Sequence, residues 1–283
     1  MSNMPSKHIE HLMALGLTEV EARAYCELLR NGPATAYKLA GAIDRSPSNI
    51  YQILDSLCRK GAILGNDAEP RIFRAVPVAE LLALLERGFQ SHKEGAIASL
   101  SAIDSYAPDD RIYNLKTVEQ VYERARSMIA AATEIVLFDL SAEPLRLLQM
   151  YLDQNAGRGI KVAGVAYGDV PKLRRVHAYA HPWQLVAKTW PGQQLTIVAD
   201  ARECLMALLA HGGETIRHAM WTDSVYFSCL QHSGLACEIQ VAANKHGPND
   251  PIVKLGLLTM PPPGLRTFTQ QQGELPKAAK RSR

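Results

Sequence analysis

Three side chains in the last third of the chain have the chemistry of metal ligands. Cys229, His232 and Cys237 offer two thiols and an imidazole, the groups that zinc prefers. Their spacing matches no standard zinc site, and the five cysteines of the chain include no Cys-x-x-Cys pair. Small thiols are common in protein cores. We therefore expect a packing role for these residues, neither a metal nor a disulfide framework, and no cofactor.

A second set of polar side chains follows segments that are predicted to be strands. Open α/β sheets bind ligands beyond the carboxyl ends of their strands, and carboxylates beside aromatic rings suit sugar hydroxyls. Residues in such places also serve as helix caps, and Ser141 and Asp223 each precede a helical stretch of sequence, so both roles stay open. The candidate ligand-binding residues are Asp139, Ser141, Glu143, Tyr167, Asp169, Asp200, Arg202 and Trp221.

The elements that must position this set alternate between strand and helix over residues 111–260. Such alternation is typical of an α/β sheet covered by helices. The predicted strands are Glu134–Leu140, Ile160–Tyr167, Leu195–Ala199 and Ala219–Trp221, and the predicted helices are Val118–Ala131, Pro144–Gly157 and Arg202–Ala210.

Residues 1–76 carry start and stop signals for several short elements. Thr18 and Glu21 form a capping box, and Thr35 can cap a second, short helix. Ser46 is a good N-cap for a third helix that ends at Lys60, before Gly61. Two short segments around a polar loop then form a hairpin. This order of elements predicts a winged helix.

The helix predicted over Ser46–Lys60 has one apolar and one polar face. Ile50, Leu54 and Leu57 lie on the face that packs on a core. In a winged helix the opposite face enters the major groove of DNA, where small polar side chains reach base edges and basic side chains reach phosphates. The candidate DNA-binding residues are Lys38, Arg45, Ser46, Ser48, Asn49, Tyr51, Gln52, Arg59, Arg71 and Arg74. The alternative is a winged helix that binds protein, because the net charge of the chain is only +3.

The same stretch contains the pattern LGL-T-x-x-E-A-R-x-Y, then G-P-A-T-A, and then S-x-x-x-x-Y-x-x-L-x-x-L-x-x-K-G. With this pattern, residues 1–76 resemble TrmB-type transcriptional regulators. The resemblance implies double-stranded DNA as a partner, with Ser46–Lys60 as the recognition helix and Arg71–Val76 as the return strand of the wing.

A long helix is predicted after Pro77, over Val78–Tyr106. Eight of its positions follow one another in steps of four and three residues, the spacing of a coiled-coil seam, with an apolar first half: Val78, Leu82, Leu85, Phe89, His92, Ala96, Ser99 and Ile103. This spacing predicts a homodimer that presents two winged helices to DNA. The alternative is a single helix that packs on its own domains.

The part beyond this helix resembles, more distantly, the phospholipase-D-like effector domain of the same family. Enzymes with that fold use a histidine followed two residues later by a lysine, and none of the nine histidines here is followed in that way. The resemblance therefore implies a sensor of a small-molecule effector, which in this family is often a sugar, and not an enzyme. A ligand-independent or partner-controlled regulator is the alternative, and a phosphodiesterase is disfavoured.

Composition places the chain among ordinary globular proteins, with 47% hydrophobic and 21% charged residues. No apolar run is long enough to cross a membrane, and Met1–Lys7 lacks the apolar core of a secretory signal, so we expect a cytoplasmic protein without membrane partners. The predicted fold is α+β and multidomain. Its parts are a winged helix-turn-helix at 1–76, a coiled-coil-like helix at 77–107, an α/β domain at 108–260 and a disordered tail at 261–283.

Overall fold

The computed structural model describes residues 6–101, 103, 110–168, 173, 175–180, 191–245, 247 and 250–267, with the backbone alone described at residues 47, 48, 253 and 254. The chain divides into two compact units, Met1–Ser105 and Tyr106–Arg283. Each has its own buried core. In the part of the chain that the structure describes, no helix is long and apolar enough to cross a membrane.

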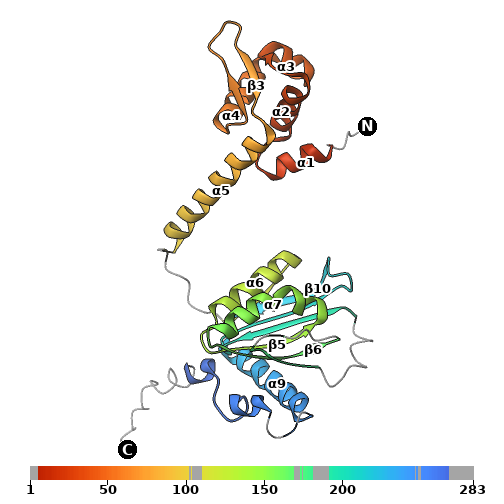
Figure 1. The fold of residues 1–283 in the computed structure, drawn as a ribbon, viewed down its shortest axis with the longest axis vertical. Coiled ribbons are helices and arrows are strands. Elements are labelled where there is room, and N and C mark those ends of the chain that lie inside the picture. Colours follow the sequence, from red (N-terminus) through yellow and green to blue (C-terminus); the bar gives the residue numbers. More distant parts are fainter. Residues whose placement is uncertain are drawn as a thin grey trace, which may run out of the picture. The chain divides into compact units, whose positions relative to one another are not determined.

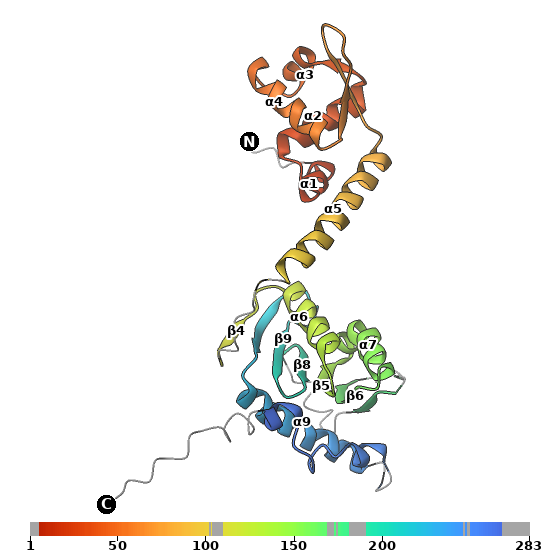
Figure 2. The same ribbon diagram turned by 90° about the vertical axis from the view of Figure 1, so that its left-hand side faces the viewer.

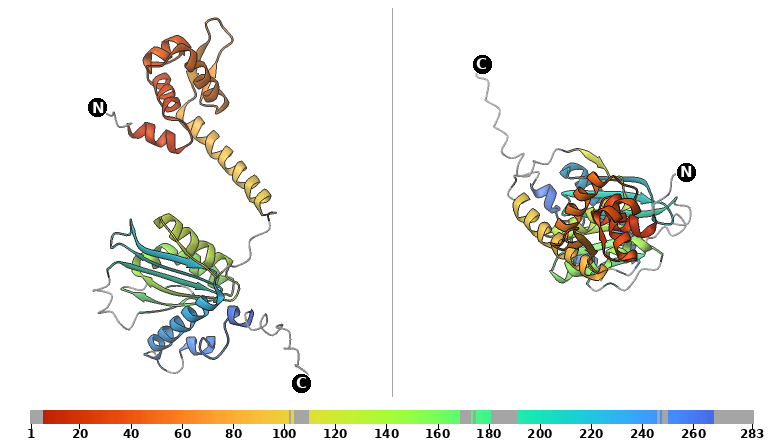
Figure 3. Two further views of the ribbon diagram at one scale, coloured as in Figure 1. Left: turned by 180° about the vertical axis from the view of Figure 1, so that it is seen from behind. Right: turned by 90° about the horizontal axis from the view of Figure 1, so that it is seen from above.

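The N-terminal unit is a winged helix-turn-helix followed by a long helix, as predicted (Figure 1). Its three-stranded sheet has the order β1-β3-β2, and the β2–β3 hairpin projects beside α3 and α4 (Figure 3). The sequence patterns did not indicate α1 or the short strand β1. The elements are α1 (Lys7–Ala14), α2 (Glu19–Asn31), β1 (Ala34–Thr35), α3 (Ala36–Ala42), α4 (Pro47–Arg59), β2 (Ile63–Gly65), β3 (Ile72–Ala75) and α5 (Val78–Leu100).

Helix starts in this unit follow the predicted caps. The Thr18 hydroxyl accepts a hydrogen bond from the Glu21 amide, and the Glu21 carboxylate accepts one from the Thr18 amide, so the capping box is complete. The Thr35 hydroxyl accepts from the Lys38 amide at the start of α3. These bonds satisfy amides that a helix start leaves without partners. The predicted starts of α2 and α3 are therefore confirmed.

Glu21 also fixes α4 against α2. Its buried carboxylate accepts hydrogen bonds from the Ser56 hydroxyl at 2.6 Å and from the Lys60 ammonium at 2.7 Å. Burial alone would raise the pKa of Glu21, but the hydrogen bonds from Lys60, Ser56 and the Thr18 amide lower that pKa to about 2. The carboxylate thus stays ionised at neutral pH and holds the C-terminal half of α4 in place.

The C-terminal unit is a seven-stranded mixed sheet with helices on both faces (Figure 2). The strand order is β4-β10-β9-β8-β5-β6-β7, in which β5, β6 and β7 are parallel and the other neighbours are antiparallel. Its elements are β4 (Ile112–Asn114), α6 (Val118–Ala131), β5 (Ile135–Ser141), α7 (Ala142–Gly157), β6 (Lys161–Tyr167), β7 (His177–Ala180), β8 (Gln193–Ala199), β9 (Glu203–Leu209), β10 (Ile216–Thr222), α9 (Val225–Asn244) and the 3-10 helix η1 (Pro251–Leu255).

Alternation along the strands separates two cores. On β5, Val136, Phe138 and Leu140 pack with α6 and α7, whereas Ile135 and Leu137 pack with α9. Side chains on a strand point to alternate faces, so Asp139 belongs to the α9 face of the sheet. The strand β5 is buried on both faces, which explains why its first four residues, Ile135–Phe138, are all apolar.

The helix predicted at Arg202–Ala210 is wrong, because these residues form β9. A tight turn joins β8 to β9, with Asp200 and Ala201 both in the left-handed region at φ 52° and 51°. Two successive residues of this kind match the twist of a hairpin. The strand then pairs with β8 and β10 on both sides. Leu, Met and Ala favour helices, but the pairing on both edges outweighs that local preference.

Part of the predicted tail contacts the sheet. Residues 263–267 form a helical turn, and the Gly264 amide donates to the Asp200 carbonyl at 2.8 Å. A side chain at Gly264 would collide with the Ala201 carbonyl, at 2.0 Å, so the close approach requires glycine. The remainder of the predicted tail, 268–283, lies outside the described residues.

Candidate nucleic-acid interface and ligand sites

Helix α4 presents a polar face to solvent. Asn49, Gln52 and Arg59 are exposed, whereas Ile50, Leu54 and Leu57 are buried in the core of the winged helix. Ser46 lies at the N-cap and Ser48 in the first turn. The predicted division of this helix into a core face and an outward face is therefore confirmed. Its outward side chains can donate and accept hydrogen bonds, as base edges require.

A groove of about 800 Å³ lies between this helix and the wing. Two exposed aromatic rings line it: Tyr51 on α4, which is 56% exposed, and Tyr37 on α3, which is 80% exposed. Tyr37 is not among the DNA-binding residues that the sequence predicted. The signal for its exposure was available, because Ala36, Leu39 and Ala40 already form the buried side of α3.

The predicted phosphate contacts differ in how they are held. Lys38, Arg45 and Arg74 are exposed. Arg71 is ordered by the wing itself: its Nε donates to the Asn66 carbonyl at 3.2 Å, and its guanidinium lies 5.2 Å from the centroid of the Phe73 ring. These basic groups lie on α3, in the α3–α4 turn and on the wing.

Helix α5 has two apolar faces with different surroundings. Leu81 is fully buried and Leu85 is partly buried against the core of the winged helix. Val78, Leu82 and Phe89 are exposed, with Phe89 at 70% and Leu82 at 40%. The predicted coiled-coil seam is therefore not exposed as a whole, because Leu85 packs against the core of its own domain. Further along, His92, Ala96, Ser99 and Ile103 are exposed.

Three predicted ligand residues lie together at the carboxyl ends of β5 and β6 in the large sheet. Asp139 and Ser141 end β5, and Tyr167 ends β6 directly opposite Ser141. The structure adds neighbours from β8 that sequence reasoning missed. Thr196 lies opposite Asp139. The side chain of Gln194 donates through Nε2 to the Thr196 hydroxyl at 3.0 Å, and the backbone amide of Gln194 donates to the Ser141 hydroxyl at 2.8 Å. We call these five residues the Asp139 group.

Asp139 is the most unusual member of this group. It is only 8% exposed, and its Oδ1 has no hydrogen-bond partner among the described residues. Burial raises its pKa to about 7, the charge of Glu238 on α9 adds to the rise, and a hydrogen bond from Gln194 opposes it. Buried acceptors without partners are rare. Asp139 can therefore exchange a proton near neutral pH or accept a hydrogen bond from a ligand.

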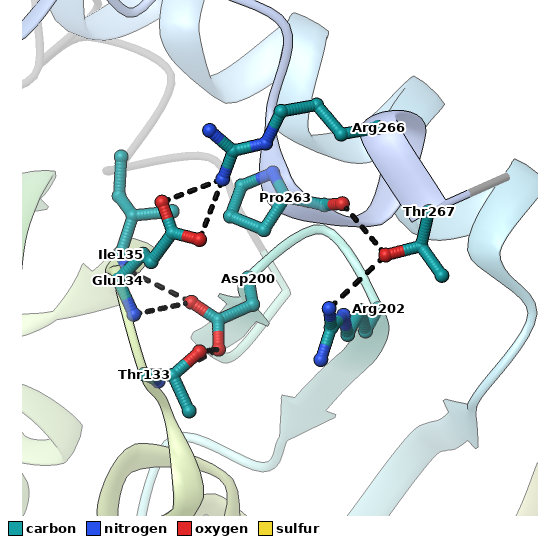
Figure 4. Close-up of polar contacts among 8 residues, drawn as sticks. All are labelled: Thr133, Glu134, Ile135, Asp200, Arg202, Pro263, Arg266 and Thr267. Carbon is teal, nitrogen blue, oxygen red and sulfur yellow. Dashed lines mark hydrogen bonds and ion pairs between the residues drawn. The ribbon is translucent and has the colours of Figure 1, made fainter. Parts of the chain in front are cut away.

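Asp200 and Arg202 do not join this group, contrary to the prediction. Both β8 and β10 run antiparallel to β5, so the residues that follow β8 or β10 lie beside the amino end of β5, far from the carboxyl end that carries Asp139. The Asp200 carboxylate accepts hydrogen bonds at 2.7–2.9 Å from the amides of residues 133–135 and from the Thr133 hydroxyl (Figure 4). Arg202 donates to the Thr267 hydroxyl at 3.1 Å. These contacts are structural.

Trp221 and Glu143 also lie apart from this group. Trp221 is on the opposite face and edge: its Nε1 donates to Glu203 at 2.9 Å, and the Arg124 guanidinium lies 4.1 Å from its ring centroid. Glu143 is exposed on α7, where a hydrogen bond from Arg146 lowers its pKa. Asp169 lies outside the described residues.

The cysteines and histidine first considered for metal binding face different surroundings. The Cys229 thiol donates to the Ala201 carbonyl at 3.7 Å, Cys237 is exposed, and His232 is buried. Burial lowers the pKa of His232 to about 4, so its ring is neutral at physiological pH, although the charge of Asp200 opposes the shift. The described residues contain no group of three or more histidine, cysteine or acidic residues that could hold a metal ion.

Comparison with protein families gives two matches to one family. Residues 12–79 match the family model described as sugar-specific transcriptional regulator TrmB. Residues 111–225 match the model described as transcriptional regulator TrmB, EBD N-terminal subdomain. The first match covers the winged helix, and the second runs from β4 to the start of α9.

Individual proteins resemble the chain over different shares of its length. The chain is 25% identical over 224 residues to the uncharacterized protein YrhO of Bacillus subtilis, covering 78% of this chain and 80% of the relative. It is 26% identical over 149 residues to the HTH-type sugar sensing transcriptional regulator TrmBL1 of Pyrococcus furiosus, covering 52% of this chain and 44% of the relative. Among solved structures, the archaeal chromatin protein TrmBL2 matches 84% of this chain and 99% of its own, at 19% identity and a TM-score of 0.41. NucT from Helicobacter pylori matches 46% and 94%, at 14% identity and a TM-score of 0.36.

Proposed function

We propose that this chain, which belongs to the TrmB family of transcriptional regulators, binds double-stranded DNA as a homodimer under the control of a small-molecule effector. The observation that carries the proposal is the outward face of α4, where Asn49, Gln52 and Arg59 are exposed above a buried apolar face. Amide side chains are the groups that read adenine edges, and arginine reads guanine or phosphate.

The groups around α4 support DNA over protein as the partner. Lys38 on α3, Arg45 in the α3–α4 turn and Arg74 on β3 are exposed basic side chains that are proposed to contact phosphates. A small net charge does not oppose this, because a local set of basic groups suffices to position a duplex. Tyr37 and Tyr51 add flat, exposed surfaces that can pack on the sugar–phosphate backbone.

Replacing Gln52 or Asn49 with alanine is expected to weaken specific binding by about 1–3 kcal/mol and to change non-specific binding little, because amide contacts to bases carry sequence information. Replacing Arg45 or Arg74 with alanine should weaken both kinds of binding and flatten the salt dependence. Fluorescence anisotropy with operator and scrambled duplexes, at several salt concentrations, measures both effects. Asn31→Ala, at the end of α2, is the matched control. Unchanged operator affinity in all four variants would refute DNA recognition by this face.

The dimer is proposed on the exposed apolar side of α5. Val78, Leu82 and Phe89 follow steps of four and seven residues along the helix, so they form one stripe. Leucine and phenylalanine in one exposed stripe favour a second copy of the same helix as the occupant. A dimer would double the DNA contacts and favour two half-sites.

The effector is proposed to bind at the Asp139 group. The Oδ1 of Asp139 has no hydrogen-bond partner among the described residues and is proposed to accept a hydrogen bond from the ligand. The Ser141, Thr196 and Tyr167 side chains lie at the same end of these strands. The matched family is described as sugar-specific, and sugars supply many hydroxyl donors. A phosphodiesterase is disfavoured, since no histidine of the chain is followed two residues later by lysine.

A thermal-shift screen of sugars against the full chain tests this part of the proposal. A specific ligand should raise the melting temperature by mass action and change operator affinity in the same concentration range, because only unequal binding to two states shifts their equilibrium. Asp139→Asn keeps the shape of the side chain and should reduce both effects about tenfold or more in ligand concentration. Glu143→Gln, at an exposed site on α7, should leave them unchanged. If no sugar or other metabolite alters operator affinity, the regulator acts without a ligand or through a protein partner.

A further inference from the structure

A second groove, of about 610 Å³, lies on the α9 face of the large sheet over β8, β9 and β10. Its floor is formed by Met206, Leu208 and Met220, which are all partly exposed. Met206 lies opposite Met220 across the two strands, and Leu208 lies opposite His218, so these side chains share one face. The volume is in the range of pockets that enclose small organic ligands.

The rim of this groove is basic. Lys116, Arg217 and His218 line it together with the polar groups of Asn114 and Gln194. No carboxylate is among the described residues that line it. Lys116 and Arg217 form no ion pair with any of the residues that the structure describes. Two cationic side chains without carboxylate partners above an apolar floor favour an anionic ligand.

A β-bulge produces this arrangement. The pairing of β10 with β9 shifts between Ile216, which lies opposite Leu209, and His218, which lies opposite Leu208. Arg217 is the extra residue. The shift lets Ile216 turn into the core on the α6 and α7 side while His218 stays on the α9 face. Bulges commonly re-aim side chains beside binding sites, and this one presents two adjacent basic residues to the groove.

We propose that this groove binds an organic anion with an apolar body, such as a carboxylate attached to a hydrocarbon or aromatic group. The basic rim pairs with the anionic group, and the Met206, Leu208 and Met220 side chains contact the apolar body. Methionine suits such a floor, because its flexible thioether adapts to ligand shape. This site differs in charge from the Asp139 group, whose buried carboxyl disfavours anions. The groove shares Gln194 with the Asp139 group, and the proposal does not depend on DNA binding.

Three probes that share one ring and differ in charge test the proposal on the full chain: phenylacetate, phenethyl alcohol and phenethylamine. Isothermal titration calorimetry should show phenylacetate binding about ten- to a hundredfold more tightly than the alcohol, because hydrogen bonds between charged groups are stronger than those to a neutral hydroxyl. The amine should bind most weakly. Equal affinity for the three probes would overturn the assignment of an anion site.

Variants locate the site. Arg217→Glu should abolish the preference for phenylacetate, and Met220→Glu should remove binding of both phenylacetate and the alcohol. Lys245→Gln, which removes an exposed charge at the end of α9, is the control and should leave affinities unchanged. Unchanged phenylacetate affinity in Arg217→Glu would overturn the proposal. A change of oligomeric state in the same variant, measured by sedimentation, would instead assign the groove to a contact between copies.

Discussion

Replacing both Leu82 and Phe89 with aspartate is expected to convert the protein to a monomer and to weaken operator binding by about 10²–10⁴-fold. Both side chains are exposed on α5, so the winged helix itself loses no core contact. Aspartate in an apolar contact between two chains would be a buried charge without a partner. Two linked binding modules gain affinity of this size over one, and the gain disappears with the dimer.

Sedimentation velocity and anisotropy with a two-half-site operator measure the two effects together, and circular dichroism confirms that the variant is folded. Val241→Asp places the same charge at an exposed apolar site on α9 and should leave mass and DNA affinity unchanged. Leu85→Asp is a poor test, because Leu85 packs against the core of its own domain. A wild-type monomer at micromolar concentration would contradict the proposed dimer.

The N-terminal unit could be predicted well because its signals are local. A threonine followed three residues later by glutamate specifies the start of α2, and Pro47 after Ser46 specifies the start of α4. The apolar face of α4 follows from helical periodicity, which needs no knowledge of the rest of the chain. Which apolar residues of α5 are buried and which are exposed could not be predicted from local signals. Spacing predicted one seam, whereas only tertiary packing shows that Leu85 contacts the winged-helix core.

The C-terminal site was predicted only in part, because strand direction is a non-local property. Asp139 and Ser141 were placed together correctly, since they end the same strand. Asp200 was expected beside them on the assumption of parallel strands. The turn at Asp200 and Ala201 carries no glycine, so nothing in the local sequence indicated a hairpin, and residues 203–209 have the composition of a helix. The bulge at Arg217 also could not be predicted from the sequence, because a bulge is defined only by the pairing with a partner strand.

Replacing Asp200 with asparagine is expected to lower the stability of the C-terminal unit by roughly 2–4 kcal/mol, because buried amides that lose an acceptor cost about 1–3 kcal/mol each. The carboxylate accepts four hydrogen bonds from residues 133–135 (Figure 4). In asparagine an NH₂ group replaces one carboxylate oxygen, so some of these donors would face another donor in place of an acceptor. Asparagine tolerates the left-handed backbone at φ 52°, so the substitution isolates the loss of acceptors from any change in turn conformation.

Thermal denaturation should show the C-terminal transition about 5–15 °C lower in Asp200→Asn than in the unaltered protein. Glu214→Gln, at an exposed position between β9 and β10, removes a carboxylate that makes none of these contacts and should leave the transition in place. Below the transition, Asp200→Asn should bind any effector found in the sugar screen with unchanged affinity, because Asp200 lies at the edge of the sheet opposite the Asp139 group. If Asp200→Asn had an unchanged melting temperature but no longer bound the effector, Asp200 would be a ligand-binding residue and the proposed structural role would be wrong.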